Sequence, residues 1–180
     1  MIKTDIKIPV NAELRKCCPC DGEDIYKMLL TIPADENGFI NDVFGKTFDE
    51  YKLFLQKQYE SSMQVGLSDG WKVPQTTYWL YVDGVPVGIS KVRHFLTDAL
   101  LKSGGNIGYA VAPEFRGRGY GKLLLKLTLA ECPAKGLKKV LITADADNIP
   151  SIKTALANGG IIEKEENGEK YIWIDIPQDE

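Results

Sequence analysis

The sequence predicts one domain of mixed α/β (α+β) class, in which a largely antiparallel central sheet of about six to seven strands carries helices on both faces. The sequence predicts a strand at 106–112, a helix at 119–132 and a second strand at 138–144. Such a βαβ unit makes its two strands parallel, with a right-handed crossover. Asp83-Gly84 and Asn167-Gly168 are hairpin signals between β-forming segments, so the strands around them are expected to be antiparallel.

Length and composition fit this fold class. The chain has 180 residues, of which 44% are hydrophobic and 26% charged, enough for one domain with a sizeable core. We expect the domain to span 1–180, with a variable N-terminal strand and helices at 1–75. The core and a C-terminal hairpin are expected at 76–176.

Charge and hydropathy argue against several classes of partner. The net charge of -3 does not support nucleic-acid binding and mildly favours a cationic substrate. No apolar run approaches the roughly 20 residues of a membrane span. The N-terminus lacks the long apolar region of a secretory signal, so a cytoplasmic location is expected.

The cysteines are expected to be free thiols. Cys17, Cys18 and Cys20 form a Cys-Cys-Pro-Cys cluster, and Cys132 is remote from it. A zinc site needs further ligands, and the only histidine is His94, so no metal is expected. A redox pair is the alternative, although no strand-then-helix context frames the motif.

The first part of the chain is expected to contain one strand and two helices. Lys3–Val10 reads as a strand and 11–20 as a loop. A helix capped by Asp21 then buries the apolar positions at helical spacing, which are Ile25, Met28, Leu29 and Ile32. Ala34–Lys46 reads as a mobile loop, because it is polar and rich in Asn and Gly. Thr47-Phe-Asp-Glu50 fits a capping box that opens a helix to about residue 63.

The middle of the chain is rich in β-formers. Thr76–Val82 and Val87–Phe95 are expected to pair around Asp83-Gly84. We assign Tyr78, Trp79 and Tyr81 to the core and the sheet faces in preference to a role in stacking against a substrate. Thr97–Lys102 reads as a short helical turn before the strand Asn106–Ala112.

The last third completes the sheet. A helix over 119–132 is ended by Pro133 and Gly136, and a buried-type strand follows at Lys138–Ala144. Asn148 is expected to cap a helix through Asn158 that points Ile149, Ile152 and Leu156 inward. The strands 161–165 and 171–176 form the final hairpin.

The stretch Arg116-Gly-Arg-Gly-Tyr-Gly121 carries the strongest functional signal. It lies between an apolar strand and a leucine-rich helix. Glycines allow a close backbone approach, and free N–H groups at a helix start bind anions such as phosphate. A Walker nucleotide motif is excluded because Lys122 is followed by Leu123, and the glycine spacing is wrong for a dinucleotide fold. A ligand-free glycine loop is the remaining alternative.

The turn and the order of elements resemble the GNAT N-acetyltransferases, which use acetyl-CoA as acyl donor. Their phosphate-binding motif, Arg/Gln-x-x-Gly-x-Gly/Ala, is matched without a gap by Arg116 to Gly121. The resemblance covers 76–176 well and 1–75 only by the order of elements. Arg93-His94 together with residues 104–109 also looks like a bacterial GNAT subgroup of unassigned substrate.

The resemblance implies a site for the CoA thioester. In the family, the strand matching 106–112 carries a bulge and splays from the strand matching 138–144, and pantetheine lies in the gap as a pseudo-strand. The backbone of Arg118–Lys122 would hold pyrophosphate, and the side chains of Arg116 and Arg118 would add charge. The implied cofactor-binding residues are Ala110, Val111, Ala112, Arg116, Gly117, Arg118, Gly119, Tyr120, Gly121, Lys122, Asn148 and Ser151.

The resemblance also implies direct attack by a primary amine in a ternary complex. The family's usual acid, a tyrosine seven residues after the matching asparagine, is replaced by Ala155. Tyr109, another tyrosine or a solvent proton is the expected substitute, and low activity is the remaining alternative. Candidates for the base are His94, Glu114 and Asp145, and a purely structural role for His94 stays open.

The acceptor is expected to be an amine on a small molecule or a peptide. Because GNAT proteins often form dimers, a homodimer is also consistent with the resemblance. The alternative function is a non-catalytic acyl-CoA-binding or sensor domain of the same fold, which Ala155 would suit.

Overall fold

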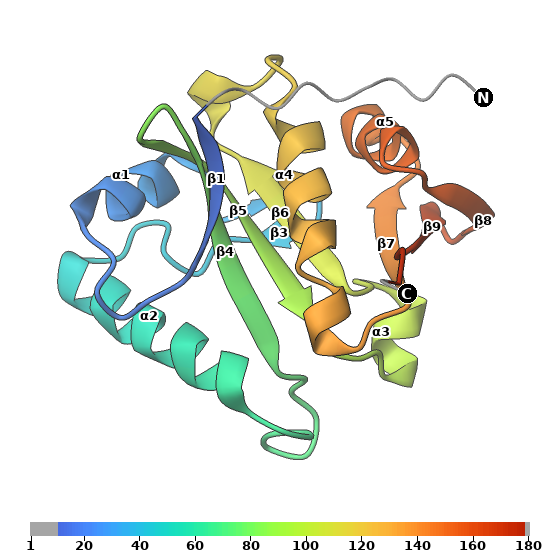
Figure 1. The fold of residues 1–180 in the computed structure, drawn as a ribbon, viewed down its shortest axis with the longest axis horizontal. Coiled ribbons are helices and arrows are strands. Elements are labelled where there is room, and N and C mark those ends of the chain that lie inside the picture. The colour runs from blue at the N-terminus through green and yellow to red at the C-terminus, as the bar shows by residue number, and fades with distance from the viewer. Residues whose placement is uncertain (1–10, 179–180) are drawn as a thin grey trace.

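The computed structural model describes residues 11–178 and has the mixed α/β architecture predicted (Figure 1). The first half contains β1 (Ala12–Lys16), α1 (Glu23–Thr31), β2 (Asp35–Glu36), β3 (Phe39–Ile40), α2 (Phe48–Met63), β4 (Gln75–Val82) and β5 (Val85–Arg93). The second half contains α3 (Asp98–Lys102), β6 (Ile107–Val111), α4 (Tyr120–Ala130), β7 (Lys139–Asp145), α5 (Ile149–Ala157), β8 (Ile161–Glu166) and β9 (Glu169–Asp175). No helix in this described range is long and apolar enough to cross a membrane.

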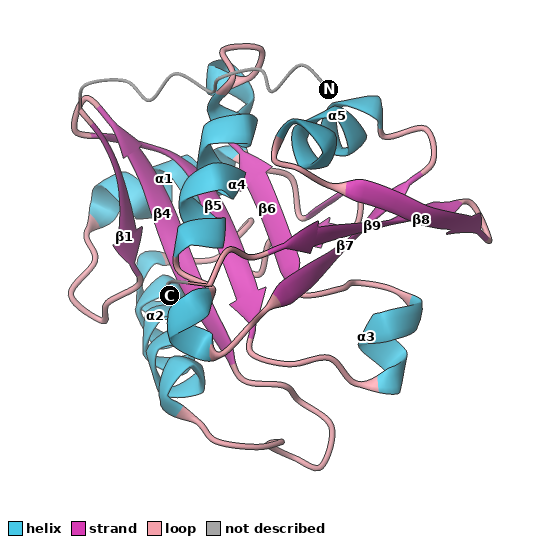
Figure 2. Cartoon of the chain, turned by 45° about the vertical axis from the view of Figure 1, so that its right-hand side comes forward, coloured by secondary structure: helices cyan, strands magenta, loops and turns pink. Residues whose placement is uncertain are grey.

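The strands form two antiparallel sheets that lie edge to edge. One sheet has the order β1-β4-β5-β6, the other has the order β7-β9-β8, and β2 pairs only with β3. In Figure 2 the facing edges are β6 and β7, which lie close at one end and separate toward the other. The predicted pair of neighbouring strands therefore splays at the centre of the molecule.

The two sheets are joined by hydrogen bonds at one place, which we call the apex. The backbone N–H of Asn106 donates to the Leu141 carbonyl (2.7 Å), and the Leu141 N–H donates to Asn106 Oδ1 (2.9 Å). Gly105 lies here at φ +56°, where a Cβ would overlap the Leu141 carbonyl oxygen. Both strands run from this apex, so the gap between them widens along their length.

The predicted bulge in β6 is absent. The pairing of β5 with β6 runs without a shift from Val92–Ile107 to Gly88–Val111. A register shift instead occurs in the neighbouring pair, between Leu80 and Tyr81. The splay therefore arises from the apex contacts and not from a bulge in β6.

Helices cover both faces of the larger sheet, as predicted (Figure 2). On β4, Trp79 and Tyr81 pack into one core cluster with α1 and α2. Leu80 and Val82 point the other way and pack with Leu123 and Leu124 of α4. This alternation follows from the two-residue period of a strand that is buried on both faces.

Several predicted elements are confirmed at their expected places. The Thr47–Glu50 capping box is formed, and Asn148 caps α5 by accepting from the Ser151 N–H. Asp83 and Asn167 each adopt φ +51° ahead of their glycines, as hairpin turns of this kind require. The turn chemistry of these segments therefore determines their structure locally.

The N-terminal part differs most from the predictions. The expected strand Lys3–Val10 lies outside the described residues. The predicted loop 11–20 is wrong, because β1 occupies half of it and pairs with β4. Since Ala12–Lys16 (AELRK) has only partial apolar character, its partner strand and not its own pattern makes it a strand.

Asp21 and the cysteines also differ from expectation. Gly22 and not Asp21 caps α1, because the Asp21 carboxylate accepts from Trp79 Nε1 (2.7 Å) and from the Cys18 N–H (2.8 Å). Cys18 and Cys20 are joined in a disulfide, so the expectation of free thiols is wrong for this pair. Cys17 and Cys132 are free and buried, as small apolar side chains are.

Two further predictions need correction. The expected loop 34–46 contains the hairpin β2–β3, which turns through Asn37-Gly38. In α5, Ile149 and Leu156 are exposed and only Ile152 of the predicted inward residues is buried. Thr154 and Ala155 are buried in their place, because α5 packs against α4 and β9.

Candidate functional site

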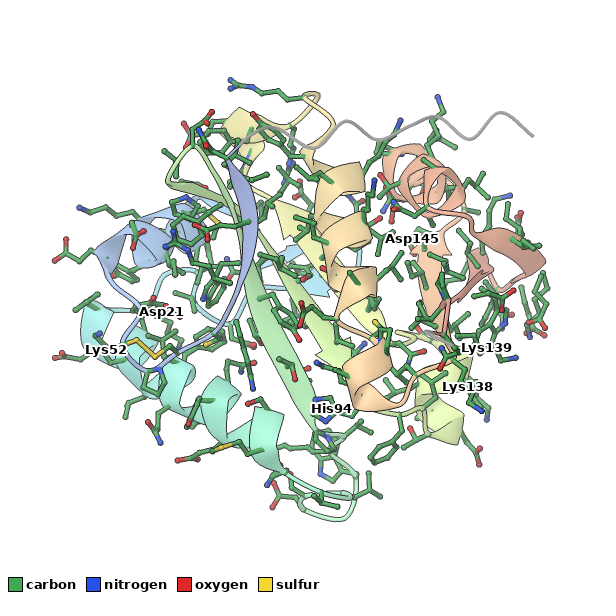
Figure 3. All side chains as sticks on the ribbon, viewed as in Figure 1. Asp21, Lys52, His94, Lys138, Lys139 and Asp145 are labelled. Atoms are coloured by element: carbon green, nitrogen blue, oxygen red, sulfur yellow. A yellow bond between two sulfur atoms is a disulfide. The ribbon has the colours of Figure 1, made fainter. Side chains whose placement is uncertain are left out.

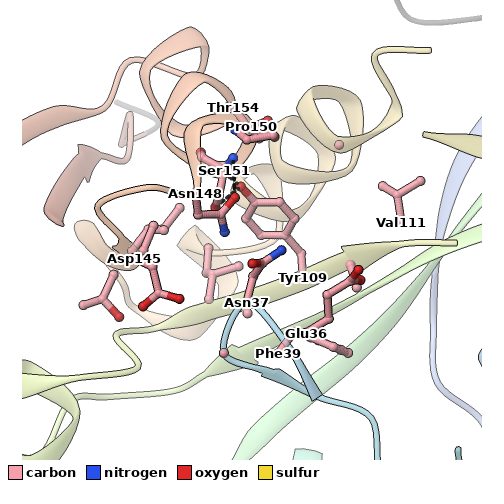
Figure 4. A pocket seen from close by; sticks show the side chains of 18 of the residues that line it. Glu36, Asn37, Phe39, Tyr109, Val111, Asp145, Asn148, Pro150, Ser151 and Thr154 are labelled. Carbon is pink, nitrogen blue, oxygen red and sulfur yellow. Dashed lines mark hydrogen bonds between the residues drawn. The ribbon is translucent and has the colours of Figure 1, made fainter. Parts of the chain in front are cut away.

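A cavity of about 990 Å³ occupies the gap between β6 and β7 and extends below the β2–β3 hairpin. Figure 4 shows this cavity, with Tyr109 from β6 pointing toward Asn148 and Ser151 of the α5 segment. Of the predicted site residues, the lining includes Tyr109, Ala110, Val111, Arg116, Gly117, Gly119, Tyr120, Gly121, Lys122, Asn148 and Ser151. Ala112, Arg118 and His94 are not among the lining residues.

The glycine-rich turn forms an anion cradle at the start of α4. Gly119 is the N-cap residue and has the left-handed conformation (φ +82°), and its carbonyl accepts the bond from Leu123 N–H (3.2 Å). The N–H groups of Tyr120, Gly121 and Lys122 precede that bond, so they have no partner within the helix. No side chain caps them, and all three residues line the cavity. The donors of the helix N-terminus are therefore available to an anion.

The arginine side chains of this turn are used differently from the prediction. The Arg116 guanidinium forms a bidentate ion pair with Glu36 of β2, and its Nε donates to the Val111 carbonyl (3.0 Å). The Arg118 guanidinium lies 5.6 Å from the centre of the Phe115 ring, outside the cavity lining. In this structure the cradle is therefore made by backbone N–H groups and the helix dipole.

One edge of β6 is open toward the cavity. Arg93 N–H donates to the Asn106 carbonyl and Ala112 N–H donates to the Val87 carbonyl, so these positions face β5. Because bonding directions alternate along an antiparallel strand, Ala110 also faces β5, whereas Tyr109 and Val111 face β7. Of the predicted pantetheine contacts, Val111 turns only a free N–H toward the gap, because its carbonyl accepts from Arg116 Nε, whereas Ala110 and Ala112 turn their main-chain groups to β5. Tyr109, which was not among them, turns both its N–H and its carbonyl toward the gap.

The Tyr109 side chain reaches from β6 to α5. Its hydroxyl lies 3.0 Å from Ser151 Oγ. Burial raises the pKa of Tyr109, an effect that hydrogen bonds with Ser151 and Thr154 oppose. The phenol therefore stays protonated throughout the neutral pH range and can donate a proton into the cavity.

The α5 segment is fixed to the cradle by side-chain bonds. Asn158 Nδ2 donates to the carbonyl of Lys122 (3.2 Å) and to that of Thr154 (3.0 Å). Ala155 is fully buried, so its position does not present a side chain to the cavity. The hydroxyl groups near the expected place of the family acid are those of Tyr109, Ser151 and Thr154.

The hairpin β2–β3 forms a wall that sequence reasoning missed. Phe39 lies against Gly108, where an added Cβ would be 3.7 Å from its ring. Lys91 of β5 donates to Asp42 (3.3 Å) and to the Ile40 carbonyl (3.2 Å), which holds the hairpin on the sheet. The signal that predicts this wall is Asn37-Gly38, a hairpin dipeptide between short segments.

His94 lies away from the cavity. In Figure 3 it is at the lower end of the sheet, well separated from Asp145. Its Nε2 lies 2.8 Å from Thr76 Oγ1. Burial lowers the pKa of His94, and the ammonium groups of Lys135 and Lys16 lower it further. Of the three predicted bases, Asp145 lines the cavity and His94 and Glu114 do not.

We expect His94→Gln to change the pH dependence of stability and to leave turnover unchanged. Because folding lowers the pKa of His94, the unfolded chain takes up the proton more readily. Wild-type stability therefore falls as the pH drops below about 6.5, and the variant lacks this component. Urea unfolding at pH 7.5 and pH 5.0 measures the difference. A large loss of turnover in a stably folded variant would restore His94 as the base.

Comparisons with known proteins agree with this geometry. A model for the Acetyltransferase (GNAT) family matches residues 41–159. No curated protein sequence matches the chain.

Solved structures share the fold over nearly the whole chain. An acetyltransferase of the GNAT family from Streptococcus pneumoniae has a TM-score of 0.64 at 19% identity, covering 93% of this chain and 100% of that one. The Campylobacter jejuni N-acetyltransferase PseH, in complex with acetyl coenzyme A, has a TM-score of 0.61 at 12% identity, with coverages of 91% and 98%. A Salmonella typhimurium acetyl transferase that modifies the N-terminal serine of ribosomal protein L7/L12 has a TM-score of 0.64 at 15% identity, with coverages of 96% and 99%. At these identities the similarity establishes the fold.

Proposed function

The chain belongs to the GNAT acetyltransferase family, and from this membership we propose that it transfers an acetyl group from acetyl-CoA to a primary amine by direct attack in a ternary complex. Acetyl-CoA as the acyl donor follows from the family, and two structural neighbours were solved with it bound. Those neighbours include N-acetyltransferases, which supports an amine as acceptor. A cytoplasmic location and a single domain over the whole chain are part of the same proposal.

The observation that carries the proposal is the meeting of an anion cradle and an open strand edge in one cavity. The N–H groups that begin α4 suit the pyrophosphate of CoA. The free N–H and carbonyl of Tyr109 suit an amide of pantetheine, which would add to β6 as a short strand and bring the thioester toward the free Val111 N–H. Both features line the same cavity, so one extended molecule can use them together.

Each step of the acetyl transfer is assigned to a different group in the cavity. Acetyl-CoA supplies the thioester that the amine attacks and departs as the thiol. The Val111 N–H, on the open edge of β6, is placed to donate to the thioester carbonyl oxygen. The Tyr109 hydroxyl holds the proton that the departing sulfur needs. The Asp145 carboxylate attracts the acceptor's ammonium and takes its proton, directly or through water.

The test is an acceptor-dependent release of thiol. The protein is incubated with acetyl-CoA and a panel of amines, while free thiol is measured and CoA binding is followed by calorimetry. Thiol release that requires both an amine and the protein is the expected result. Tight CoA binding without release across a broad panel would favour a sensor domain. Absence of CoA binding would overturn the proposal altogether.

We expect Tyr109→Phe to lower kcat by about 10²-fold, because a positioned acid contributes rate enhancement of that order. Affinity for CoA should stay unchanged, since the main-chain groups of residue 109 remain. The measurements are steady-state kinetics and calorimetry. Tyr59→Phe, on the outer face of α2, is the matched control and should match the wild type. A kcat for Tyr109→Phe equal to that of wild type would assign the proton to Ser151 or to solvent.

A further inference from the structure

Arg93 supplies a positive charge to the cavity that no carboxylate of the described chain neutralises. It lies at the end of β5, on the same face of the strand as Lys91, and it lines the cavity. Its Nη1 donates to the carbonyls of Gly104 (2.9 Å) and Gly105 (3.0 Å). None of the ion pairs among residues 11–178 includes Arg93.

Two of the other cations that line the cavity have carboxylate partners, and the remaining two, Lys122 and Lys153, lie on α4 and α5. Lys91 is paired with Asp42 at 3.3 Å, and Arg116 is paired with Glu36. Burial lowers the pKa of Arg93, and no carboxylate opposes that effect. Burying a cation without an anion costs free energy. An unpaired guanidinium at the cavity wall therefore indicates that an anionic group of a ligand binds there.

The guanidinium is held in one orientation with donors to spare. The two carbonyl contacts use Nη1 and leave Nε and Nη2 without a partner in the described chain. No side-chain nitrogen of residues 11–178 is both fully buried and unpaired, so these donors remain accessible. A planar guanidinium whose Nε and Nη2 are both free matches a carboxylate in geometry.

Two carboxylates lie at the same side of the cavity without pairing to Arg93. Asp145 and Glu169 face each other in the register of β7 and β9, and both line the cavity. Ser103 Oγ donates to Glu169 (3.1 Å), and the next residue, Gly104, is the one that holds Arg93. Like charges directly opposite are unfavourable between strands, and a bound ammonium group would relieve them.

We propose that the acceptor is a small amino-carboxylate, whose carboxylate binds Arg93 while its ammonium group lies on the Asp145 and Glu169 side before it is deprotonated. This inference rests on the proposed acetyl transfer to an amine and names the class of acceptor. A carboxylate fits better than a phosphate, because Arg93 offers one unneutralised charge, and Lys91 on the same strand and Arg116 are already paired.

Matched acceptors test the class directly in the wild-type protein. L-Lysine is compared with cadaverine, which lacks only the carboxylate, and L-phenylalanine with phenethylamine. β-Alanine is compared with 2-aminoethylphosphonate, which replaces the carboxylate by a phosphonate. We expect at least one carboxylate acceptor to exceed its matched partner in kcat/KM by about tenfold or more, as a charge-assisted hydrogen bond predicts. The difference should appear mainly in KM.

Two substitutions assign the preference to Arg93. In Arg93→Gln the ratio of kcat/KM between matched acceptors should fall toward one, and Arg93→Lys should retain part of it. Affinity for CoA should stay unchanged in both, which a general loss of structure would not allow. Lys57→Gln, on the exposed face of α2, removes the same charge and should keep the wild-type ratio. Should Arg93→Gln fail to fold, the wild-type ratios and the Arg93→Lys variant carry the test.

The outcomes that contradict this inference can be distinguished from those that contradict the proposed function. Equal use of acceptors with and without the carboxylate overturns this inference and leaves the proposed function intact. A preference for the phosphonate, or an unchanged ratio in folded Arg93 variants, also overturns it. Absence of transfer to every amine overturns the proposed function, and this inference with it.

Discussion

Gly119→Glu is expected to abolish CoA binding, with a loss of affinity of about 10²-fold or more. Gly119 begins α4 at φ +82°, a conformation that costs a non-glycine residue about 1–2 kcal/mol. A Cβ at this position meets no atom within 4 Å, so the new side chain extends into open space beside the cradle. Its carboxylate would repel the pyrophosphate and compete for the free N–H groups of Tyr120 to Lys122.

Calorimetric titration with CoA measures this loss, and circular dichroism verifies the fold. Two controls separate the causes. Gly119→Ala introduces the backbone strain without charge, so it should bind more weakly than wild type but far better than the glutamate variant. Gly136→Glu places the same side chain at another left-handed glycine with open surroundings, at the end of the short turn after α4. Wild-type affinity in Gly119→Glu would show that the cradle is not the phosphate site.

The geometry of the glycine-rich turn at the start of α4 was predictable because local chemistry determines it. A glycine that must adopt positive φ, followed by the leucine period of a helix, specifies both the turn and the free N–H groups. The same holds for the capping box of α2 and the two Asx-Gly hairpins. In each of these segments, the residues that form the structure are close together in sequence.

The acceptor half was not predictable because it depends on partners far apart in the chain. The pairing of Arg116 with Glu36 joins residues 80 positions apart, and it removes a guanidinium that the motif alone would assign to phosphate. β1 likewise needs β4 as a partner before its weak pattern becomes a strand. His94 has the residue type of a base, but only the fold shows that its ring faces Thr76 and not the cavity.

The β6 edge shows how the register refines a family resemblance. Sequence matching names three successive residues, Ala110 to Ala112, as pantetheine contacts. The antiparallel ladder with β5 takes up the main-chain groups of every second residue. Of the three matched residues, only Val111 has a main-chain group that faces the gap, and Tyr109, which was not matched, also has such groups. The alternation along the strand therefore determines which matched positions can bind a ligand with their backbone.

The splay that opens this gap depends on Gly105, and Gly105→Ala is expected to lower the free energy of unfolding by about 3 kcal/mol or more. A non-glycine residue at positive φ costs of order 1–3 kcal/mol. The added methyl group also overlaps the Leu141 carbonyl oxygen, a backbone atom that cannot rotate away, and overpacking of this kind costs about 1–3 kcal/mol. Urea-induced unfolding, followed by tryptophan fluorescence, measures the change.

Gly168→Ala is the matched control, because Gly168 also has positive φ (+79°) but its Cβ would meet nothing within 4 Å. It reports the backbone strain alone, so the difference between the two variants isolates the clash at the apex. The clash must push β6 and β7 apart where Asn106 bonds to Leu141. We therefore expect Gly105→Ala to weaken CoA binding as well, since the width of the gap sets the distance between the open edge of β6 and α5. Equal losses of stability in the two variants would mean that the contact with the Leu141 carbonyl adds no free-energy cost to the backbone strain.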